Sequence, residues 1–167
     1  MITDKNKILE VLKVALRGTY YTRFTYYITA FECELFNDDL NINAYLILSE
    51  IELADKNEWS KWVKSTPFNI ENYNGPEEPA RVFLMGLLTQ ARLQGVEEEN
   101  EGTLIITFQN GMRVRLLGET EFEDTSWNIE FRNAYGEVIG NCTSSFNKMY
   151  LTISEELSEK LHLTNTW

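Results

Sequence analysis

Histidine, cysteine and proline are scarce in this sequence of 167 residues, with one, two and three copies respectively. The single histidine, His162, cannot form a paired-histidine zinc motif, and a catalytic triad would need it beside a nucleophile that the sequence does not mark. No glycine-rich phosphate loop and no calcium-binding loop occurs. We therefore expect no cofactor, no metal site and no enzymatic activity.

Signals for disulfide formation, export and membrane insertion are also lacking. Cys33 and Cys142 lie far apart and match no short-spaced motif, so we expect two free thiols in the core of a protein in a reducing compartment. Glu10 and Lys13 interrupt the apolar core that a signal peptide would need. The longest apolar run, Val82 to Leu88, is far shorter than the roughly 20 residues of a membrane span. We expect a soluble, cytoplasmic protein that does not enter the membrane.

Basic residues are outnumbered, 15 against 26 acidic ones, which gives a formal net charge of −11. A negative field of this size opposes approach to nucleic acid and to anionic lipid. It attracts a basic protein partner and raises the association rate more than the affinity. Acidity can also serve solubility alone, and both interpretations stay open.

The length predicts a single domain covering residues 1–167. A first helix is expected from Asp4 to Arg17, because apolar residues recur there at helical spacing and Gly18 follows as a stop. One strand is expected at Phe31–Leu35, where apolar residues alternate with glutamates, and another from Ala44 to Leu53.

A central helix is expected in the middle of the chain. Turn residues crowd the segment from Lys64 to Pro79, which predicts a loop. The helix starts near Glu77 to Pro79 and ends near Gly95. Its apolar residues extend almost around the cylinder, so we expect it to be the best buried element.

The segment Thr103–Leu117 contains an Asn-Gly pair that predicts a β-hairpin. A two-residue loop would place arginines opposite apolar residues. A three-residue loop, Gln109 to Gly111, instead pairs Phe108 with Met112 and aligns the apolar positions of both strands. We therefore predict the three-residue loop, with Gly111 left-handed.

The outward side of this hairpin is the expected partner-binding face, together with its continuation if the strand runs unbent through Gly118. An acidic run between the central helix and the hairpin is expected to be a loop, either simply solvated or an acidic patch for a partner. The candidate partner-binding residues are Glu97, Glu98, Glu99, Glu101, Arg113, Arg115, Glu119, Glu121, Glu123 and Asp124.

After the hairpin, an inward alternation begins at Trp127, followed by a turn at 133–136, strands at 138–142 and 146–153 and a short helix at 154–161. Aromatic residues cluster between Tyr20 and Phe31, where core packing and a binding surface are both open interpretations.

Two segments resemble each other: Leu48–Asp55, followed by Trp59, and Leu117–Asp124, followed by Trp127. Duplication and convergent turn chemistry explain this about equally well. Each segment carries glutamates two residues apart, which share one face of a strand and can hold magnesium or act as acid and base. A carboxylate-dependent metal hydrolase is thus one possible function, although such spacings arise easily by chance in so acidic a chain.

Together these elements predict an α+β fold, a predominantly antiparallel sheet with an N-terminal helix and one well-buried central helix. If the repeat is real, they form two similar helix-plus-hairpin halves around one core.

The segment from Gly102 to Phe131, GTLIITFQNGMRVRLLGETEFEDTSWNIEF, resembles segments of small bacterial proteins that serve as immunity proteins to secreted toxins. The resemblance implies a cytoplasmic protein that neutralises a cognate toxin, often a nuclease, by covering its active site or substrate surface. Small size, negative charge and the lack of a catalytic motif favour the same interpretation. We expect a protein-binding inhibitor of a basic toxin domain, with a regulatory or structural adaptor as the alternative. The sequence does not define an oligomeric state.

Overall fold

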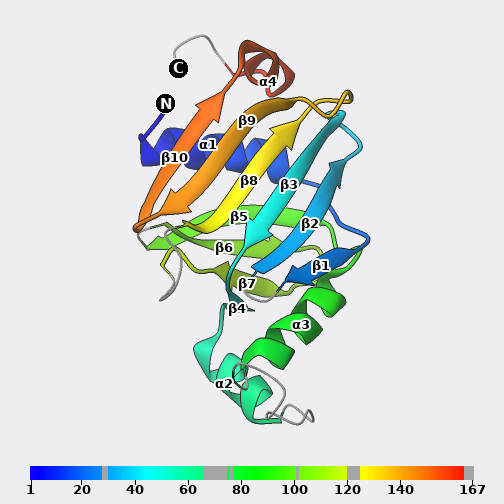
Figure 1. Cartoon of the computed structure of the whole chain (residues 1–167), viewed down its shortest axis with the longest axis vertical. Helices are drawn as coiled ribbons and strands as arrows, with labels where there is room; N and C mark the ends of the chain where they lie inside the picture. The colour runs from blue at the N-terminus through cyan, green and yellow to red at the C-terminus, as the bar shows by residue number, and fades with distance from the viewer. Residues whose placement is uncertain (28–29, 66–74, 76, 101, 120–124, 164–167) are drawn as a thin grey trace.

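The chain folds into two antiparallel sheets with helices packed around them (Figure 1), which confirms the α+β prediction. The computed structural model describes residues 1–27, 30–65, 75, 77–100, 102–119 and 125–163. The helices in this part of the chain are α1 (Lys5–Leu16), α2 (Lys56–Ser65), α3 (Glu77–Leu88) and α4 (Glu155–Lys160). The strands are β1 (Phe24–Tyr27), β2 (Ala30–Asn37), β3 (Ile42–Leu48), β4 (Ile51–Leu53), β5 (Leu93–Asn100), β6 (Thr103–Phe108), β7 (Arg113–Leu116), β8 (Thr125–Arg132), β9 (Val138–Ser145) and β10 (Lys148–Ile153).

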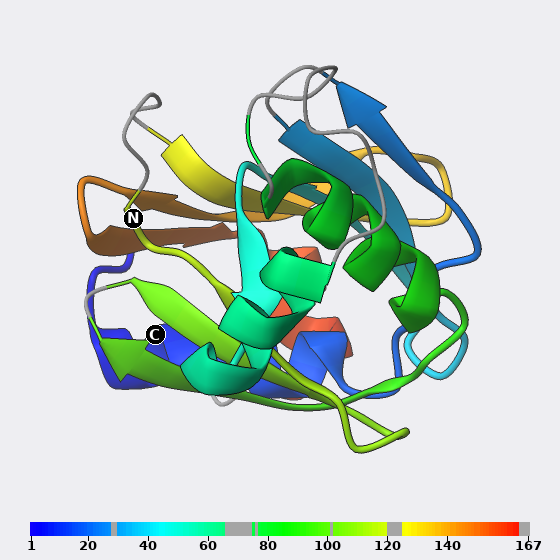
Figure 2. The ribbon, with the colours of Figure 1, turned by 90° about the horizontal axis from the view of Figure 1, so that it is seen from below.

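The large sheet has six strands in the order β1-β2-β3-β8-β9-β10, and the small sheet has four in the order β4-β7-β6-β5. Figure 1 shows the large sheet in front, with α1 behind it. The small sheet lies across its lower end, and α2 and α3 lie beyond the small sheet (Figures 1 and 2). In each sheet, strands from the first half of the chain meet strands from the second half at one pair, β3 with β8 in the large sheet and β4 with β7 in the small sheet.

Helix α1 packs along β5 and β10 and confirms the predicted first helix. The Asp4 carboxylate caps it by accepting the backbone N–H groups of Asn6 and Lys7 at 2.9 and 3.2 Å. One face is buried at helical spacing, as an amphipathic helix requires. The residues of that face are Ile8, Val11, Leu12, Ala15 and Leu16.

The core fills the space between the two sheets. Alternate residues of β2, β3 and β8 point into it from the large sheet, and alternate residues of β6 and β7 enter from the small sheet. Cys33 and Cys142 are buried, unpaired thiols, as predicted. The inward alternation that begins at Trp127 is confirmed, as are the turn, the two strands and the short helix that follow it. The strand bounds differ, because β9 extends to Ser145 and Phe146 and Asn147, predicted to begin the last strand, form the turn before β10.

The hairpin β6–β7 has the predicted three-residue loop. The Phe108 N–H donates to the Met112 carbonyl at 2.8 Å, and Ile106 faces Val114 across the strands. Gly111 has φ 85°, a left-handed conformation that favours glycine. Packing of apolar residues on one face therefore selected the register correctly.

The chain crosses between the sheets at two adjacent points, and this makes the single predicted strand from Ala44 to Leu53 wrong. The strand divides into β3 in the large sheet and β4 in the small sheet. The return crossing lies between β7 and β8. Backbone bonds join the two crossings, from the Ser49 N–H to the Ser126 carbonyl at 3.0 Å and from the Leu117 N–H to the Glu50 carbonyl at 3.4 Å.

Helix α3 ends at Leu88, so the prediction that it would reach Gly95 was wrong. Gln90 adopts φ 66°, the left-handed conformation that commonly ends helices and that usually falls to glycine or asparagine. The Gln90 N–H donates to the Tyr21 carbonyl at 2.8 Å, which anchors the turn to the start of the large sheet. The acidic run that we expected to be a loop belongs largely to strand β5, which pairs with β6 across two register shifts.

Helix α3 is buried on one face only, contrary to the expectation of burial almost all round. Leu84 and Met85 are fully buried, whereas Phe83 and Leu87 are 54% and 44% exposed. Its start at Glu77, with Pro79 in the first turn, agrees with the prediction. Most of the expected loop before it lies outside the described residues.

Candidate protein-binding site

The small sheet has one face toward the core and one face outward, and the outward face carries charged residues on three of its strands. Glu52 lies on β4, Arg113 and Arg115 on β7, and Glu97 and Glu99 on β5. Helix α2 and the exposed side of α3 flank this face (Figure 2). The face therefore places Glu97 and Glu99 of the acidic run beside Arg113 and Arg115 of the hairpin.

The prediction that Arg115 points into solvent was wrong, because its side chain is only 4% exposed. It forms a bidentate pair with Glu99, with Nε and Nη2 at 2.7 and 2.9 Å from the carboxylate oxygens. Its Nη2 also donates to the Ala54 carbonyl at 2.9 Å, and its Nη1 lies 3.6 Å from Glu52. Arg115 thus joins β7, β5 and the β4–α2 connection.

Beyond Arg115, glutamate and arginine side chains continue to alternate in a row of ion pairs, through Glu52 and Arg81 to Glu50. Arg81 of α3 lies 3.0 Å from Glu50 and 3.8 Å from Glu52, so these two glutamates share a face, as the two-residue spacing predicts. Desolvation raises the pKa of Glu52, and the neighbouring Arg81 and Arg115 oppose that rise. The hydrogen bond from Arg115 lowers the pKa of Glu99. These carboxylates are engaged in holding α3 and β7 to β4 and β5.

The remaining predicted site residues lie in different places. Arg113 pairs with Glu97, and both side chains are half exposed, at 53% and 56%. Glu98 faces the other way, toward α1, where Lys5 Nζ lies 2.9 Å from its carboxylate.

Glu119 does not continue the outward face, because β7 ends at Leu116. The chain turns there toward the large sheet, with the Gly118 N–H bonded to Thr103 Oγ1 at 3.0 Å. Asn147, in the turn between β9 and β10, donates to Glu119 at 3.0 Å. The predicted residues Glu101, Glu121, Glu123 and Asp124 lie outside the described residues.

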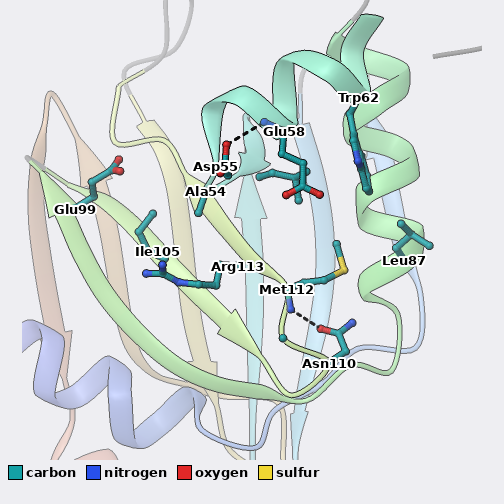
Figure 3. A pocket seen from close by; sticks show the side chains of 12 residues that line it. Ala54, Asp55, Glu58, Trp62, Leu87, Glu99, Ile105, Asn110, Met112 and Arg113 are labelled. Atoms are coloured by element: carbon teal, nitrogen blue, oxygen red, sulfur yellow. Dashed lines mark hydrogen bonds between the residues drawn. The ribbon is translucent and has the colours of Figure 1, made fainter. Parts of the chain in front are cut away.

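A cleft of about 750 Å³ opens beside the outward face, between α2, the exposed side of α3 and the hairpin loop (Figure 3). Apolar side chains and three carboxylates share its walls, with Arg113 as the basic group among the described residues that line it. The lining residues are Leu53, Ala54, Asp55, Glu58, Trp62, Leu87, Glu99, Ile105, Asn110, Gly111, Met112 and Arg113.

Sequence reasoning missed α2, which forms one wall of this cleft. Asp55 caps the helix by accepting the N–H groups of Asn57 and Glu58 at 2.8 and 3.0 Å, and these bonds lower the pKa of its carboxyl group. An aspartate followed three residues later by a glutamate is a helix-start signal. Trp59 and Trp62, three residues apart, then lie on neighbouring positions of one helix face. These signals could have predicted α2.

The outer face of the large sheet is a second surface, uncovered by helices in the view of Figure 1. Its polar side chains bond to one another: Asn141 Nδ2 and Thr143 Oγ1 both donate to Asn128 Oδ1, at 2.7 and 2.5 Å. The Arg132 guanidinium lies 4.9 Å from the centre of the Tyr45 ring. A partner that bound here would have to replace existing hydrogen bonds.

The aromatic cluster of the N-terminal half belongs mainly to the core. Tyr21 and Phe31 are 3% and 1% exposed, and Tyr26 packs against Phe31 with ring centres 4.6 Å apart. Of the three aromatic residues on β1, Phe24 and Tyr26 are partly buried against the core, whereas Tyr27 is 55% exposed. The core interpretation therefore holds for the buried members.

Groups suited to nucleophilic or metal chemistry are dispersed in the described part of the chain. Burial raises the pKa of both cysteine thiols to about 12, so they are protonated at neutral pH. His162 is exposed after α4 and donates its backbone N–H to the Glu159 carbonyl. No group of three or more His, Cys, Asp or Glu side chains in the described residues could hold a metal ion.

No protein-family model, curated protein or solved structure matches this chain. Its function is therefore inferred from the geometry of its surfaces. Within the described residues, no helix is long and apolar enough to cross a membrane.

Proposed function

We propose that this chain is a cytoplasmic protein-binding domain of the toxin-immunity type, which neutralises a basic toxin domain by covering part of its surface. The observation that carries the proposal is the cleft on the outward side of the small sheet. It combines apolar walls with three carboxylates, Asp55, Glu58 and Glu99, in a chain of net charge −11. Concave, partly apolar surfaces with a few polar groups are typical binding sites.

The charge supports a basic protein as the partner. A cationic toxin domain is drawn toward an acidic surface over a distance of about one Debye length, roughly 10 Å at moderate salt. Nucleic acid would be repelled by the same field. Neutralisation by covering the toxin needs a complementary surface and no chemistry, which suits a chain without a recognisable catalytic motif.

The hydrolase interpretation receives less support. Its motivation was two sets of glutamates at two-residue spacing. Glu121 and Glu123 of the second set lie outside the described residues, whereas Glu50 and Glu52 of the first set both lie within ion-pair distance of Arg81. A metal ion bound between them would be repelled by that guanidinium. A regulatory adaptor remains the alternative, since it needs the same binding surface but would leave toxicity unchanged.

Coexpression tests the proposal. The chain is produced in bacteria together with the toxic C-terminal domain encoded beside its gene. We expect restored growth and a complex that copurifies and elutes as one species. An unrelated acidic protein of similar size and charge is the control. Binding without rescue would favour the adaptor, and neither binding nor rescue with any neighbouring gene product would overturn the proposal.

A further inference from the structure

The walls of the cleft differ in chemistry from one end to the other (Figure 3). Trp62 and Leu87 project from α2 and α3 on one side, and Met112 approaches them from the hairpin loop. Asp55 and Glu58 lie at the start of α2, and Glu99 lies across from them on β5. A molecule in the cleft would therefore meet an apolar surface and carboxylates at the same time.

The charges in the cleft are only partly balanced within the protein. Glu99 is held by Arg115, and Arg113 is paired with Glu97. Asp55 accepts two backbone N–H groups, and Glu58 forms no ion pair with any of the described residues. Besides the backbone N–H groups, Lys61 of α2 lowers the pKa of Asp55, and besides Arg115, Lys56 of α2 lowers the pKa of Glu99. The negative charge at the end formed by α2 is therefore partly offset, and Glu58 is the carboxylate left without an ion pair among the described residues.

We infer that the cleft binds a short segment of the partner protein that carries a lysine or arginine side chain. The inference rests on the proposed function and names what the site recognises. The aliphatic stem of such a side chain packs on Trp62, Leu87 and Met112, while its charged end reaches Glu58 and Asp55. A volume of about 750 Å³ exceeds that of one side chain and suits a short peptide segment.

An anionic or purely apolar segment fits this cleft less well. An anion would face Asp55, Glu58 and Glu99 with Arg113 as its only counter-charge among the described lining residues, and Arg113 already contacts Glu97. An apolar segment would bury the Glu58 carboxylate without a partner, which is costly. A cationic side chain with a long apolar stem satisfies both parts of the cleft.

Glu58→Lys reverses the charge inside the cleft, and Glu10→Lys is its matched control. Both residues are exposed and helical, and both changes shift the net charge equally. Glu10 lies on α1, on the core side of the small sheet and away from the cleft. Any difference between the two variants therefore reports the position of the charge and not the total.

The first measurement uses a defined probe. An end-capped hexapeptide with two arginines and two leucines is titrated into the 15N-labelled protein, and its counterpart with glutamates in place of arginines is titrated in parallel. The indole N–H signal of Trp62, assigned with Trp62→Phe, should shift saturably with the arginine peptide only. The Kd should rise at least about tenfold in Glu58→Lys and less than about twofold in Glu10→Lys. No saturable shift, or equal Kd values in both variants, would overturn the inference.

The second measurement separates this inference from the proposed function. Both variants are tested for toxin neutralisation in the coexpression assay. If the wild type neutralises the toxin and Glu58→Lys does so as well as Glu10→Lys, the cleft is not the recognition site, although the proposed function stands. If the arginine peptide binds at Trp62 but the wild type neutralises no toxin, the proposed function fails while the chemistry of the cleft is supported.

Discussion

At the scale of single residues, the two arginines of β7 do different work although they are only two positions apart. Arg115 is buried and contacts Glu99, Glu52 and the Ala54 carbonyl. Arg113 is half exposed and contacts Glu97. Removing one partner of a buried ion pair leaves charges without compensation, whereas an exposed pair contributes little.

We predict that Arg115→Met lowers the free energy of unfolding by about 2–3 kcal/mol. Arg113→Met, the matched change on the same strand, should cost less than about 0.5 kcal/mol. Urea denaturation followed by circular dichroism measures both values. Similar losses for the two variants would show that the buried Arg115 network stabilises the fold no more than the exposed Arg113–Glu97 pair does.

At the scale of elements, the end of α3 at Leu88 separates this helix from strand β5, which begins at Leu93. Gln90 holds a left-handed conformation with φ 66°, while Gly86, inside the helix, has open space where a Cβ would lie. Glycine is thus present where a helix disfavours it and absent where a helix end favours it.

We predict that Gly86→Ala and Gln90→Gly each raise the free energy of unfolding by about 0.5–1 kcal/mol. The alanine favours the helical backbone, and the glycine removes the strain of the left-handed turn. Gln90→Ala is the control for loss of the glutamine side chain and should not stabilise the protein. Thermal and urea denaturation check the three variants, and stabilisation by Gln90→Ala equal to that by Gln90→Gly would refute the explanation.

This helix end also shows how far sequence reasoning reaches. The hairpin register was predictable because, of the two loop lengths compared, only the three-residue loop pairs the core-facing apolar residues of one strand with those of the other. The end of α3 was not, because a glutamine gives no stop signal and the real stop depends on a bond to the Tyr21 carbonyl. The acidic residues of β5 were likewise predicted to form a solvated loop, because nothing in the local sequence indicates their partners. Glu97 and Glu99 pair with Arg113 and Arg115 of β7, and only the folded sheet brings β5 within reach of β7.

The two crossings between the sheets, from β3 to β4 and from β7 to β8, could not be predicted from the sequence either. The segment from Ala44 to Leu53 reads as one apolar strand, and the step at Ser49 is fixed by a bond to Ser126, which is distant in the sequence. The cleft depends on this step, because the crossing places β4 and α2 beside the hairpin. The helix α2 that forms one wall has a helix-start signal in the sequence, Asp55 followed by Glu58. No sequence signal indicates that α2, α3 and the hairpin come together to form the cleft.

At the scale of the whole molecule, the net charge of −11 and the local chemistry of the cleft should affect different steps of binding. Long-range attraction guides a basic partner during the encounter, and salt weakens it. Contacts inside the cleft form only once the complex is made, so they determine how long it lasts. The charge of the molecule and the position of each carboxylate can therefore be separated by kinetics.

We predict that raising the salt concentration from about 50 to about 500 mM slows association with the cognate toxin domain by at least about tenfold and changes the dissociation rate by much less. Glu10→Lys should slow association modestly, through net charge alone. Glu58→Lys should slow it by a similar factor and, in addition, accelerate dissociation, because it removes a contact within the complex. Stopped-flow mixing and surface-immobilised binding measure the two rates. If both variants changed only the association rate, the acidity of this protein would act through its overall field, and the cleft would have no part in holding the partner.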